Sequence, residues 1–204
     1  MTPAPDPSQE QQPIVPDRFA PGPVPLVEED DGVGWQADDA VLPHELKAAA
    51  GAFPTGVTVI TTRSAGDCVG MTVSSFTSVS IDPPLVLVCL ARTAAALPAF
   101  RVGAPMGINV LARHQRDVAM AFVRPFDERF DGVDVHEGPN DVPFIQEAAA
   151  WMSGHVARIY DGGDHVILLA RVNAVHRSGE QPLLYHSGAM YDWITPSGEP
   201  DHQA

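Results

Sequence analysis

The segment 69–84, VGMTVSSFTSVSIDPP, carries the side chains with the clearest chemical potential in this sequence. It places Gly70 and six hydroxyl side chains within stretches of strand-forming apolar residues: Thr72, Ser74, Ser75, Thr77, Ser78 and Ser80. Because side chains alternate between the two faces of a strand, these hydroxyls fall on both faces, one of which should be buried. Buried hydroxyls need hydrogen-bond partners, which a polar ligand could supply, and Gly70 would let the backbone approach a flat ligand closely. A strand edge that merely carries Ser and Thr is the alternative.

A second candidate is the tetrapeptide Gly162-Gly163-Asp164-His165, which lies between two β-rich stretches. Paired glycines next to aspartate are typical of a tight hairpin turn. Taken alone, the motif is consistent with a solvated Asp164 and an ordinary histidine at the start of a strand. His155, His165 and His176 do not favour a metal site, because they are widely spaced and lack clustered carboxylates.

The elements that must position these residues are mostly short strands. Strands are expected at 57–62, 69–73, 76–81, 85–90, 106–111, 149–160, 165–176, 183–186 and 190–193. The unbroken apolar run 85–90 predicts a strand buried on both faces. Helices are expected at 42–53, 94–102 and 115–122, and the Asp- and Gly-rich stretch 126–138 predicts a loop. Since strands do not alternate with helices, the pattern favours a mainly β fold with a few helices, closed as an antiparallel barrel.

The charge of the chain is concentrated near its beginning. The 204 residues carry a net charge of −14, and residues 1–42 hold nine acids against a single Arg18, together with eight of the 20 prolines. Such a composition cannot bury enough apolar surface to offset the entropy of ordering. We therefore expect a disordered acidic leader at 1–38, one domain at 39–196 and a short tail at 197–204. The rest of the chain, with a net charge near −6, is unremarkable.

Composition also excludes several classes of function. The acidic balance argues against nucleic acid or an anionic membrane as the main partner. No apolar run reaches the roughly 18–20 residues of a membrane span, and no secretory signal pattern is present. Cys68 and Cys89 are too few for a disulfide framework or a zinc ribbon, and we expect buried, reduced thiols in a cytoplasmic protein. Glycine-rich Rossmann and P-loop motifs are absent, so any nucleotide must be held in another way.

Seven segments carry a family resemblance in their order along the chain. They are FPTGVTVITT at 53–62, GMTVSSF at 70–76, SVSIDPPLVL at 78–87, INVL at 108–111, FDERF at 126–130, GDH at 163–165 and PLLYH at 182–186. Each segment alone is weak evidence, but in this order they cover nearly the whole expected domain. The chain resembles the short-chain flavin reductases, the reductase components of two-component flavin monooxygenases. The resemblance implies an antiparallel split β-barrel of the FMN-binding type.

The resemblance implies an NAD(P)H:flavin oxidoreductase that supplies reduced FMN or FAD to a separate oxygenase and works as a homodimer. A flavin carrier or sensor without turnover, and an oxidase with tightly bound FMN, remain alternatives. The sequence does not distinguish FMN from FAD or NADH from NADPH, and it does not identify the oxygenase. Flavin reduction needs donors aimed at the ring atoms where negative charge accumulates, and main-chain amides meet that need without titrating.

The resemblance also assigns roles to particular residues. Flavin contacts are implied for Val69, Gly70, Met71, Thr72, Val73, Ser74 and Ser75, for Cys89, Leu90 and Ala91 along the next strand, and for Phe122 at the far end. Gly162 and Gly163 would approach the nicotinamide, with Asp164 and His165 as the catalytic pair. Relatives usually hold the flavin phosphate at positions matching Ala94, Ala95 and Ala96, which lack polar side chains here. Arg92 and Thr93 are therefore expected to take over that contact.

Overall fold

The structure is a computed structural model that describes residues 41–192. The chain divides after Leu42, and the description below concerns the second unit, which begins at Pro43. The expected leader at 1–38 and tail at 197–204 lie outside the described residues, as does the last residue of the strand expected at 190–193.

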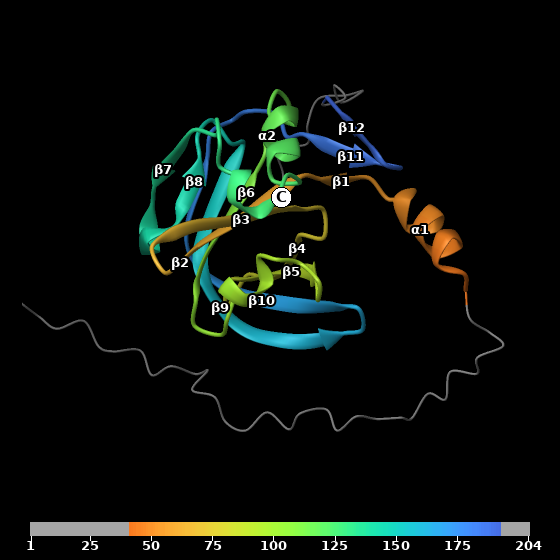
Figure 1. The fold of residues 1–204 in the computed structure, drawn as a ribbon, viewed down its shortest axis with the longest axis horizontal. Coiled ribbons are helices and arrows are strands. Elements are labelled where there is room, and N and C mark those ends of the chain that lie inside the picture. Colours follow the sequence, from red (N-terminus) through yellow and green to blue (C-terminus); the bar gives the residue numbers. More distant parts are fainter. Residues whose placement is uncertain (1–40, 193–204) are drawn as a thin grey trace, which may run out of the picture. The chain divides into compact units, whose positions relative to one another are not determined.

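A seven-stranded antiparallel sheet forms the body of the described unit (Figure 1). Its strands are β2 (Thr58–Ser64), β3 (Asp67–Val73), β4 (Thr77–Ser80), β5 (Leu85–Ala91), β6 (Pro105–Val110), β9 (Ala150–Gly162) and β10 (His165–Arg177). Their order in the sheet is β3-β2-β6-β9-β10-β5-β4. The sheet curls round so that its first and last strands, β3 and β4, are consecutive in the chain. This arrangement confirms the predicted mainly β, antiparallel split barrel.

Smaller elements complete the unit. They are α1 (Pro43–Gly51), α2 (Arg116–Ala121), a sheet of β1 (Thr55–Gly56), β11 (Leu184–His186) and β12 (Ala189–Tyr191), and the pair β7 (Val135–Glu137) and β8 (Pro143–Ile145). The helix expected at 94–102 is wrong: only a short 3-10 turn, Leu97–Ala99, forms there, because Pro98 has no backbone N–H to donate to Ala94 in an α-helix. The loop expected at 126–138 contains β7, which pairs with β8 over three residues. Within residues 41–192, no helix combines the length and apolar character needed to cross a membrane.

Two apolar clusters stabilise the unit. The larger lies inside the curled sheet and includes Ile60, Leu90, Phe100 and Leu168, all almost completely buried. The smaller lies between β2, α2 and β8 and includes Val59, Leu111, Phe122 and Ile145. Burial of large apolar side chains on this scale supplies most of the driving force for folding.

A buried amide connects three strands between the two clusters. Asn109 on β6 donates through Nδ2 to the carbonyl of Val59 at 3.0 Å, and its Oδ1 accepts the backbone N–H of Ile145 at 2.9 Å. Thr61 on β2 donates to the carbonyl of Pro143 at 2.6 Å. Since unpaired polar groups are costly inside a protein, these bonds specify how β8 docks on the sheet.

Strand β5 differs from the prediction of a strand buried on both faces. Val86, Val88 and Leu90 are buried, whereas Leu85, Leu87 and Cys89 on the other face are half-buried. The reason is topological: β5 lies second from one end of an antiparallel sheet, and only the inner face of that sheet covers the core. The continuous apolar sequence of β5 therefore means that the outer face of the strand is apolar as well, but this face is only half-buried.

The helix α1 forms where helical spacing predicted it, but it buries no residue. Leu46 on the helix and Phe53 just after it are 62 % and 74 % exposed. Its C-terminal end is fixed to the β11–β12 turn, because Ser187 donates to the carbonyl of Gly51 through both its backbone N–H and its hydroxyl. The apolar side of α1 therefore lacks a covering surface among the described residues of its own chain.

Candidate flavin and nucleotide site

The connection between β3 and β4 crosses from one edge of the sheet to the other and carries Ser74 and Ser75. Ser75 makes two hydrogen bonds to β5: its hydroxyl donates to the carbonyl of Cys89 at 3.0 Å and accepts the backbone N–H of Cys89 at 2.9 Å. Ser74 is exposed. The two serines implied as flavin contacts thus lie next to Cys89, one fixed to the strand and the other facing outward.

The hydroxyl-rich segment is less buried than its sequence indicated. None of its six hydroxyl residues is buried: Thr72, Ser75 and Ser80 are half-buried, and Ser74, Thr77 and Ser78 are exposed. Thr72 donates to the carbonyl of Ala119 at 2.8 Å. The expectation of buried hydroxyls is therefore wrong, because β3 and β4 are edge strands whose outer sides are not covered by another strand.

Gly70 is needed for packing inside the domain, which the sequence alone did not indicate. A Cβ at Gly70 would lie 2.6 Å from Cε1 of Phe122, and the Phe122 ring is 2 % exposed. The close approach that glycine permits is therefore made by a ring of this chain. Phe122 also packs edge-on against Phe130, with centroids 4.9 Å apart. The side chain of Phe122 supports β3 from inside the protein, and its implied flavin contact stays a prediction.

Arg129 adds a second support to the same point of β3. Its Nη1 donates to the carbonyl of Gly70 at 2.9 Å, and its Nε donates to the carbonyl of Arg124 at 3.1 Å. Partial burial lowers the pKa of the Arg129 guanidinium. The Arg-Phe ending of the segment 126–130, which belonged to the family resemblance, thus holds the segment after α2 against β3.

The Gly162–His165 turn lies directly beside the end of β5. His165 pairs with Ala91, Val166 with Leu90 and Ile167 with Cys89 in the β5–β10 ladder. Gly163 has φ +76°, at the first position of a two-residue hairpin loop where glycine is favoured. The strand implied to line the flavin and the turn implied to approach the nicotinamide are therefore neighbours.

Arg92 fixes this turn to β5. Its backbone N–H donates to the carbonyl of Asp164 at 2.9 Å, its Nε donates to the carbonyl of Gly163 at 2.7 Å, and its Nη2 lies 2.5 Å from Oδ2 of Asp161. The N–H of Gly163 and the guanidinium of Arg92 lower the pKa of Asp161. A role for Arg92 at the flavin phosphate stays a prediction, and its guanidinium would have to leave these partners to fulfil it.

His165 and Asp164 also interact with each other. Nδ1 of His165 lies 2.7 Å from Oδ1 of Asp164, and this hydrogen bond lowers the pKa of the Asp164 carboxyl. Both side chains are accessible, with the Asp164 side chain 93 % and the His165 side chain 45 % exposed. The carboxylate can thus fix the orientation of the imidazole while one face of the ring stays open to a ligand.

Cys68 and Cys89 are free thiols, as expected, but both are only half-buried. Burial raises the pKa of the Cys89 thiol, so this side chain stays protonated and is a weak nucleophile. Cys89 therefore contributes its backbone and a small apolar surface rather than thiol chemistry.

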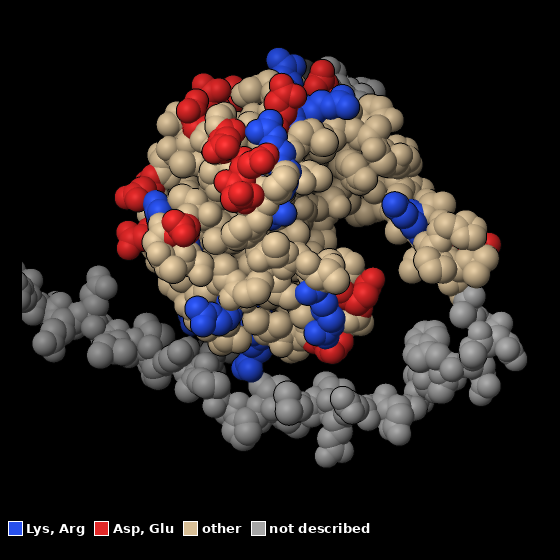
Figure 2. Space-filling view, viewed as in Figure 1, with Lys and Arg blue, Asp and Glu red and all other residues tan. Residues whose placement is uncertain are grey.

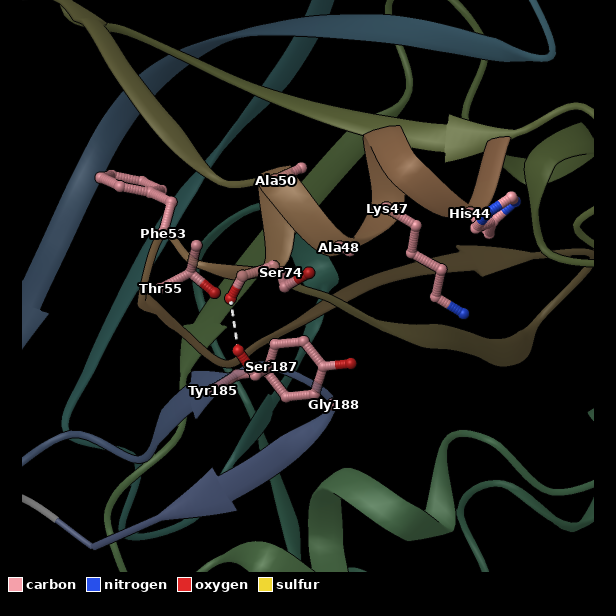
Figure 3. A pocket seen from close by; sticks show the side chains of 11 residues that line it. His44, Lys47, Ala48, Ala50, Phe53, Thr55, Ser74, Tyr185, Ser187 and Gly188 are labelled. Atoms are coloured by element: carbon pink, nitrogen blue, oxygen red, sulfur yellow. Dashed lines mark hydrogen bonds between the residues drawn. The ribbon is translucent and has the colours of Figure 1, made fainter. Parts of the chain in front are cut away.

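A cavity of about 840 Å³ lies under α1 and reaches Ser74 (Figure 3). Its lining comes from α1, β1, the β3–β4 connection and the β11–β12 turn: His44, Lys47, Ala48, Ala50, Gly51, Phe53, Thr55, Ser74, Tyr185, Ser187 and Gly188. This volume lies within the roughly 300–1,000 Å³ of typical small-molecule sites. The lining contains basic and hydroxyl side chains but no carboxylate. The sequence did not single out Lys47 or His44, because neither belongs to a recognisable local motif, and Tyr185 was part of the segment 182–186 without a role of its own.

Comparison with known proteins identifies the family. The family model described as "Flavin reductase like domain" matches residues 50–193, which include β1 to β12. The chain belongs to the flavin reductase family. This membership agrees with the resemblance carried by the seven segments, and it covers the edge strands, the Gly162–His165 turn and most of the cavity lining.

Individual flavin reductases are similar over most of this chain. The reductase subunit Stc3 of stachydrine N-demethylase from Rhizobium meliloti is 43% identical over 75% of this chain and 67% of its own length. The FMN reductase (NADH) SmoA of Agrobacterium fabrum is 40% identical over 72% of this chain and 84% of its own. The solved structure of the NADH:FAD oxidoreductase SgcE6 of Streptomyces globisporus, in complex with NAD and FAD fragments, matches with 32% identity and a TM-score of 0.71, covering 78% of this chain and 99% of that one. The chain spans only 48% of the length of two further relatives.

The residues of the described domain fit a flavin in two respects. The cavity under α1 contains a buried polar atom, Oγ1 of Thr55, that has no hydrogen-bond partner within the described part of the chain. A bound polar ligand would supply that partner. The second respect is the edge position of β3 and Ser74–Ser75, which presents backbone groups and hydroxyls beside β5. Ala94, Ala95 and Ala96 offer no polar side chain to a phosphate, so the phosphate needs another partner.

Proposed function

We propose that this chain is an NADH-dependent flavin reductase that delivers reduced FMN or FAD to a separate monooxygenase. The observation that carries the proposal is the contact between the end of β5 and the Gly162–His165 turn: Ala91 pairs with His165, and Arg92 fixes Gly163 and Asp164. A flavin held by Ser74, Ser75 and Cys89 and a nicotinamide held at the turn would thus be next to each other. Enzymes that transfer a hydride between two rings obtain most of their rate from such positioning.

When bound, the flavin supplies the redox chemistry by accepting two electrons from NADH. The chain itself contributes binding and orientation. Ser75 holds the β3–β4 connection at a fixed distance from Cys89. Exposed Ser74 and the outer edge of β3 provide donors that need no reorganisation, and such donors stabilise negative charge where it develops. Phe122 and Arg129 keep β3 in place from the opposite side.

In this proposal, the nicotinamide is held by the Gly162–His165 turn. His165 offers an accessible imidazole whose orientation Asp164 fixes at 2.7 Å. The adjacent glycines leave room for a ring to approach the backbone. Arg92 and Asp161 keep the turn close to β5, so that a ring held there cannot drift from the flavin.

The test is an anaerobic titration of the purified full chain with NADH and, separately, NADPH, in the presence of FMN or FAD. We expect NADH oxidation that depends on added flavin and is catalytic in protein. Protein that binds flavin but consumes no NADH would instead be a carrier or sensor. Flavin that co-elutes with the protein through gel filtration would indicate a tightly bound cofactor and direct oxidation of a small substrate.

The oxygenase partner and the homodimer are parts of the same proposal. Names of relatives such as the stachydrine N-demethylase reductase subunit support an oxygenase that receives reduced flavin. The exposed apolar residues Leu46 on α1, Phe53 after it and Ile81 near β4 support a second copy as a cover for apolar surface. Multi-angle light scattering at micromolar concentration should give twice the monomer mass. We place the reaction in the cytoplasm, where free thiols such as Cys68 stay reduced.

A further inference from the structure

Arg129 is a partly buried cation that has no acidic partner in the described part of the chain. None of the ion pairs within residues 41–192 includes its guanidinium. Its Nη1 and Nε donate instead to two neutral carbonyls, those of Gly70 and Arg124. Partial burial lowers the pKa of Arg129, and no carboxylate among these residues opposes that shift. A charge that loses solvation without gaining a counter-charge is destabilising, so the support of β3 does not by itself account for a cation at this position.

The acids of the same segment do not neutralise this charge. Asp127, Glu128 and Asp131 are near Arg129 in the sequence, but all three are exposed to solvent. Figure 2 shows acidic and basic side chains interspersed over the surface around α2, where water and salt screen them from one another. Arg129 is less exposed than these acids, because its guanidinium reaches β3 and lies over the ring of Phe126, 5.5 Å from its centroid. The electrostatic potential that Arg129 produces at β3 is therefore positive.

The guanidinium lies against the strand that is implied to hold the flavin. Gly70, whose carbonyl accepts its hydrogen bond at 2.9 Å, belongs to the segment 69–75 for which flavin contacts are expected. Two residues further along β3, Thr72 donates to the carbonyl of Ala119 on α2. β3 is the end strand of the large sheet, with β2 as its only neighbour there. A flavin in contact with this part of β3 would thus be separated from a positive charge by no more than the strand itself.

Flavin reduction creates a negative charge at this place. NADH transfers a hydride, that is two electrons and one proton, to the oxidised ring and leaves as NAD+. The ring is neutral before the transfer and carries one negative charge after it, until a proton from solvent neutralises that charge. A cation that is fixed in advance stabilises the new charge without reorganisation, whereas it interacts only weakly with the neutral oxidised ring.

We propose that Arg129 stabilises the negative charge that the flavin gains on reduction, so that the chain binds reduced flavin more tightly than oxidised flavin. The proposal rests on the flavin reductase function and adds to it a residue that increases the driving force of hydride transfer. Main-chain amides of β3 cannot replace Arg129 in this role, because an amide carries no net charge. Arg129 acts across β3 and is therefore a positioning residue for the reaction rather than a catalytic one.

The test measures, without oxygen, the affinity of the full chain for oxidised FMN and for reduced FMN. It compares wild type with Arg129→Met, which keeps an unbranched side chain without the charge, and with Arg129→Lys, which keeps the charge. Arg124→Met is the matched control, because it removes a cation of the same segment whose Nη1 donates to the carbonyl of Asp131 at 3.4 Å.

We expect Arg129→Met to weaken the binding of reduced FMN about 10-fold more than the binding of oxidised FMN. For a two-electron couple, this change lowers the midpoint potential of the bound flavin by about 30 mV. Arg129→Lys should keep most of the wild-type ratio of the two affinities, and Arg124→Met should keep all of it.

Other results would overturn the assignment. Equal weakening of both forms in Arg129→Met would show that Arg129 only supports β3. A wild type that binds reduced FMN no more tightly than oxidised FMN would also overturn it, and this measurement does not require any variant to fold. The same loss of preference in Arg124→Met would assign the effect to the charge of the whole segment instead. Wild-type protein that binds neither form of FMN would overturn the proposed flavin reductase function itself, which distinguishes that failure from a failure of the assignment to Arg129.

Discussion

Ser75 lies opposite Cys89, just beyond the last backbone-paired residues of β4 and β5. Thr77 pairs with Leu87 in that ladder, so continuing the register by two residues brings Ser75 opposite Cys89. The side-chain hydroxyl of Ser75, rather than its backbone, donates to and accepts from Cys89. A side chain thus replaces the backbone partner, and the chain can turn away toward β3 without leaving the Cys89 amide unpaired.

Ser75→Ala should therefore destabilise the domain by about 1–2 kcal/mol, because a half-buried N–H and a carbonyl of β5 lose their partner. Flavin affinity should fall as well, since the β3–β4 connection is released from β5. Ser75→Thr is the matched control, because it keeps the hydroxyl. Urea unfolding and flavin titration of the three proteins measure both effects. Equal stability of wild type and Ser75→Ala would show that the bond contributes nothing.

Gly70→Ala should destabilise the protein by about 1–3 kcal/mol through overpacking. The added Cβ would lie 2.6 Å from the Phe122 ring and 3.2 Å from the carbonyl oxygen of Ile60. Gly56→Ala is the control, because the nearest atom to its added Cβ is 4.0 Å away. The cost of Gly70→Ala should shrink in a Phe122→Leu background. Thermal unfolding of the wild type, the two single variants and the double variant gives the coupling free energy between the two positions. Strictly additive losses of stability would contradict the contact.

The ion pair between Arg92 and Asp161 should be insensitive to pH near neutrality. The N–H of Gly163 and the Arg92 guanidinium hold the pKa of Asp161 below its ordinary value of 3.8. A lowered pKa in the folded state means that the stabilisation is fully present above pH 3.8 and is lost as the pH falls through the lower value. Carboxyl carbon shifts in an NMR titration should show Asp161 titrating below 3.8. A midpoint above that value would contradict the ion pair.

Asp161→Asn should raise the KM for NADH by about 2- to 5-fold, the range expected when an exposed ion pair is lost. It should leave FMN binding unchanged, because Asp161 contacts Arg92 and Gly163 and not the β3–β4 connection that carries Ser74 and Ser75. Asp67→Asn serves as the control for removing an exposed carboxylate from the sheet. A parallel loss of FMN affinity in Asp161→Asn alone would mean that the turn also holds the flavin.

His165→Ala should raise the KM for NADH by roughly 10-fold while flavin affinity stays nearly the same. The imidazole is accessible at the turn, whereas the serines implied to hold the flavin lie on the β3–β4 connection. Asp164→Asn should have a smaller effect, since the amide oxygen can still accept the hydrogen bond of Nδ1. Steady-state kinetics with varied NADH, together with flavin titration, separates the two. Weaker flavin binding in His165→Ala would mean that the turn contacts the flavin rather than the nicotinamide.

Removal of residues 1–38 should leave kcat and both KM values within experimental error of the full chain. The reason lies in composition: most of the net charge of −14 belongs to residues 1–42, whereas the family model matches only from residue 50. The measurement is steady-state kinetics of the shortened chain at several ionic strengths. A loss of activity would assign the acidic leader a part in substrate binding or assembly.

The strands and their order in the chain were predictable because alternation and β-branched residues are local signals. Strands β2, β6, β9 and β10 lie close to the expected ranges, and the Gly162–His165 motif forms the hairpin turn that its glycines indicated. The exposure of each strand was not predictable in the same way. The apolar run 85–90 cannot reveal whether its second face meets a core, because that depends on the position of β5 in the sheet.

The residues of the candidate site also differ in whether the sequence could identify them. Motif residues such as Ser75 and His165 were identified because they belong to short segments with a family pattern. Lys47 was not, because it belongs to no such segment and only the bond of Ser187 to Gly51 fixes the end of its helix to the β11–β12 turn. Arg92 was expected at a phosphate because its charge was visible in the sequence, whereas its partner Asp161 follows only from the β5–β10 pairing.

Trp151 stacks on His176 at one end of the long hairpin, with ring centroids 5.5 Å apart, and contacts Phe144 at 4.6 Å on β8. It is the only tryptophan among residues 41–192. The Gly162–His165 turn lies at the other end of the same hairpin, whose two strands pair from Ala150 to Gly162. The domain therefore has a built-in optical probe: once Trp35 and Trp193 are replaced by Phe, the emission of Trp151 would report on the packing of β8, β9 and β10, and energy transfer would report on the distance from Trp151 to a bound flavin.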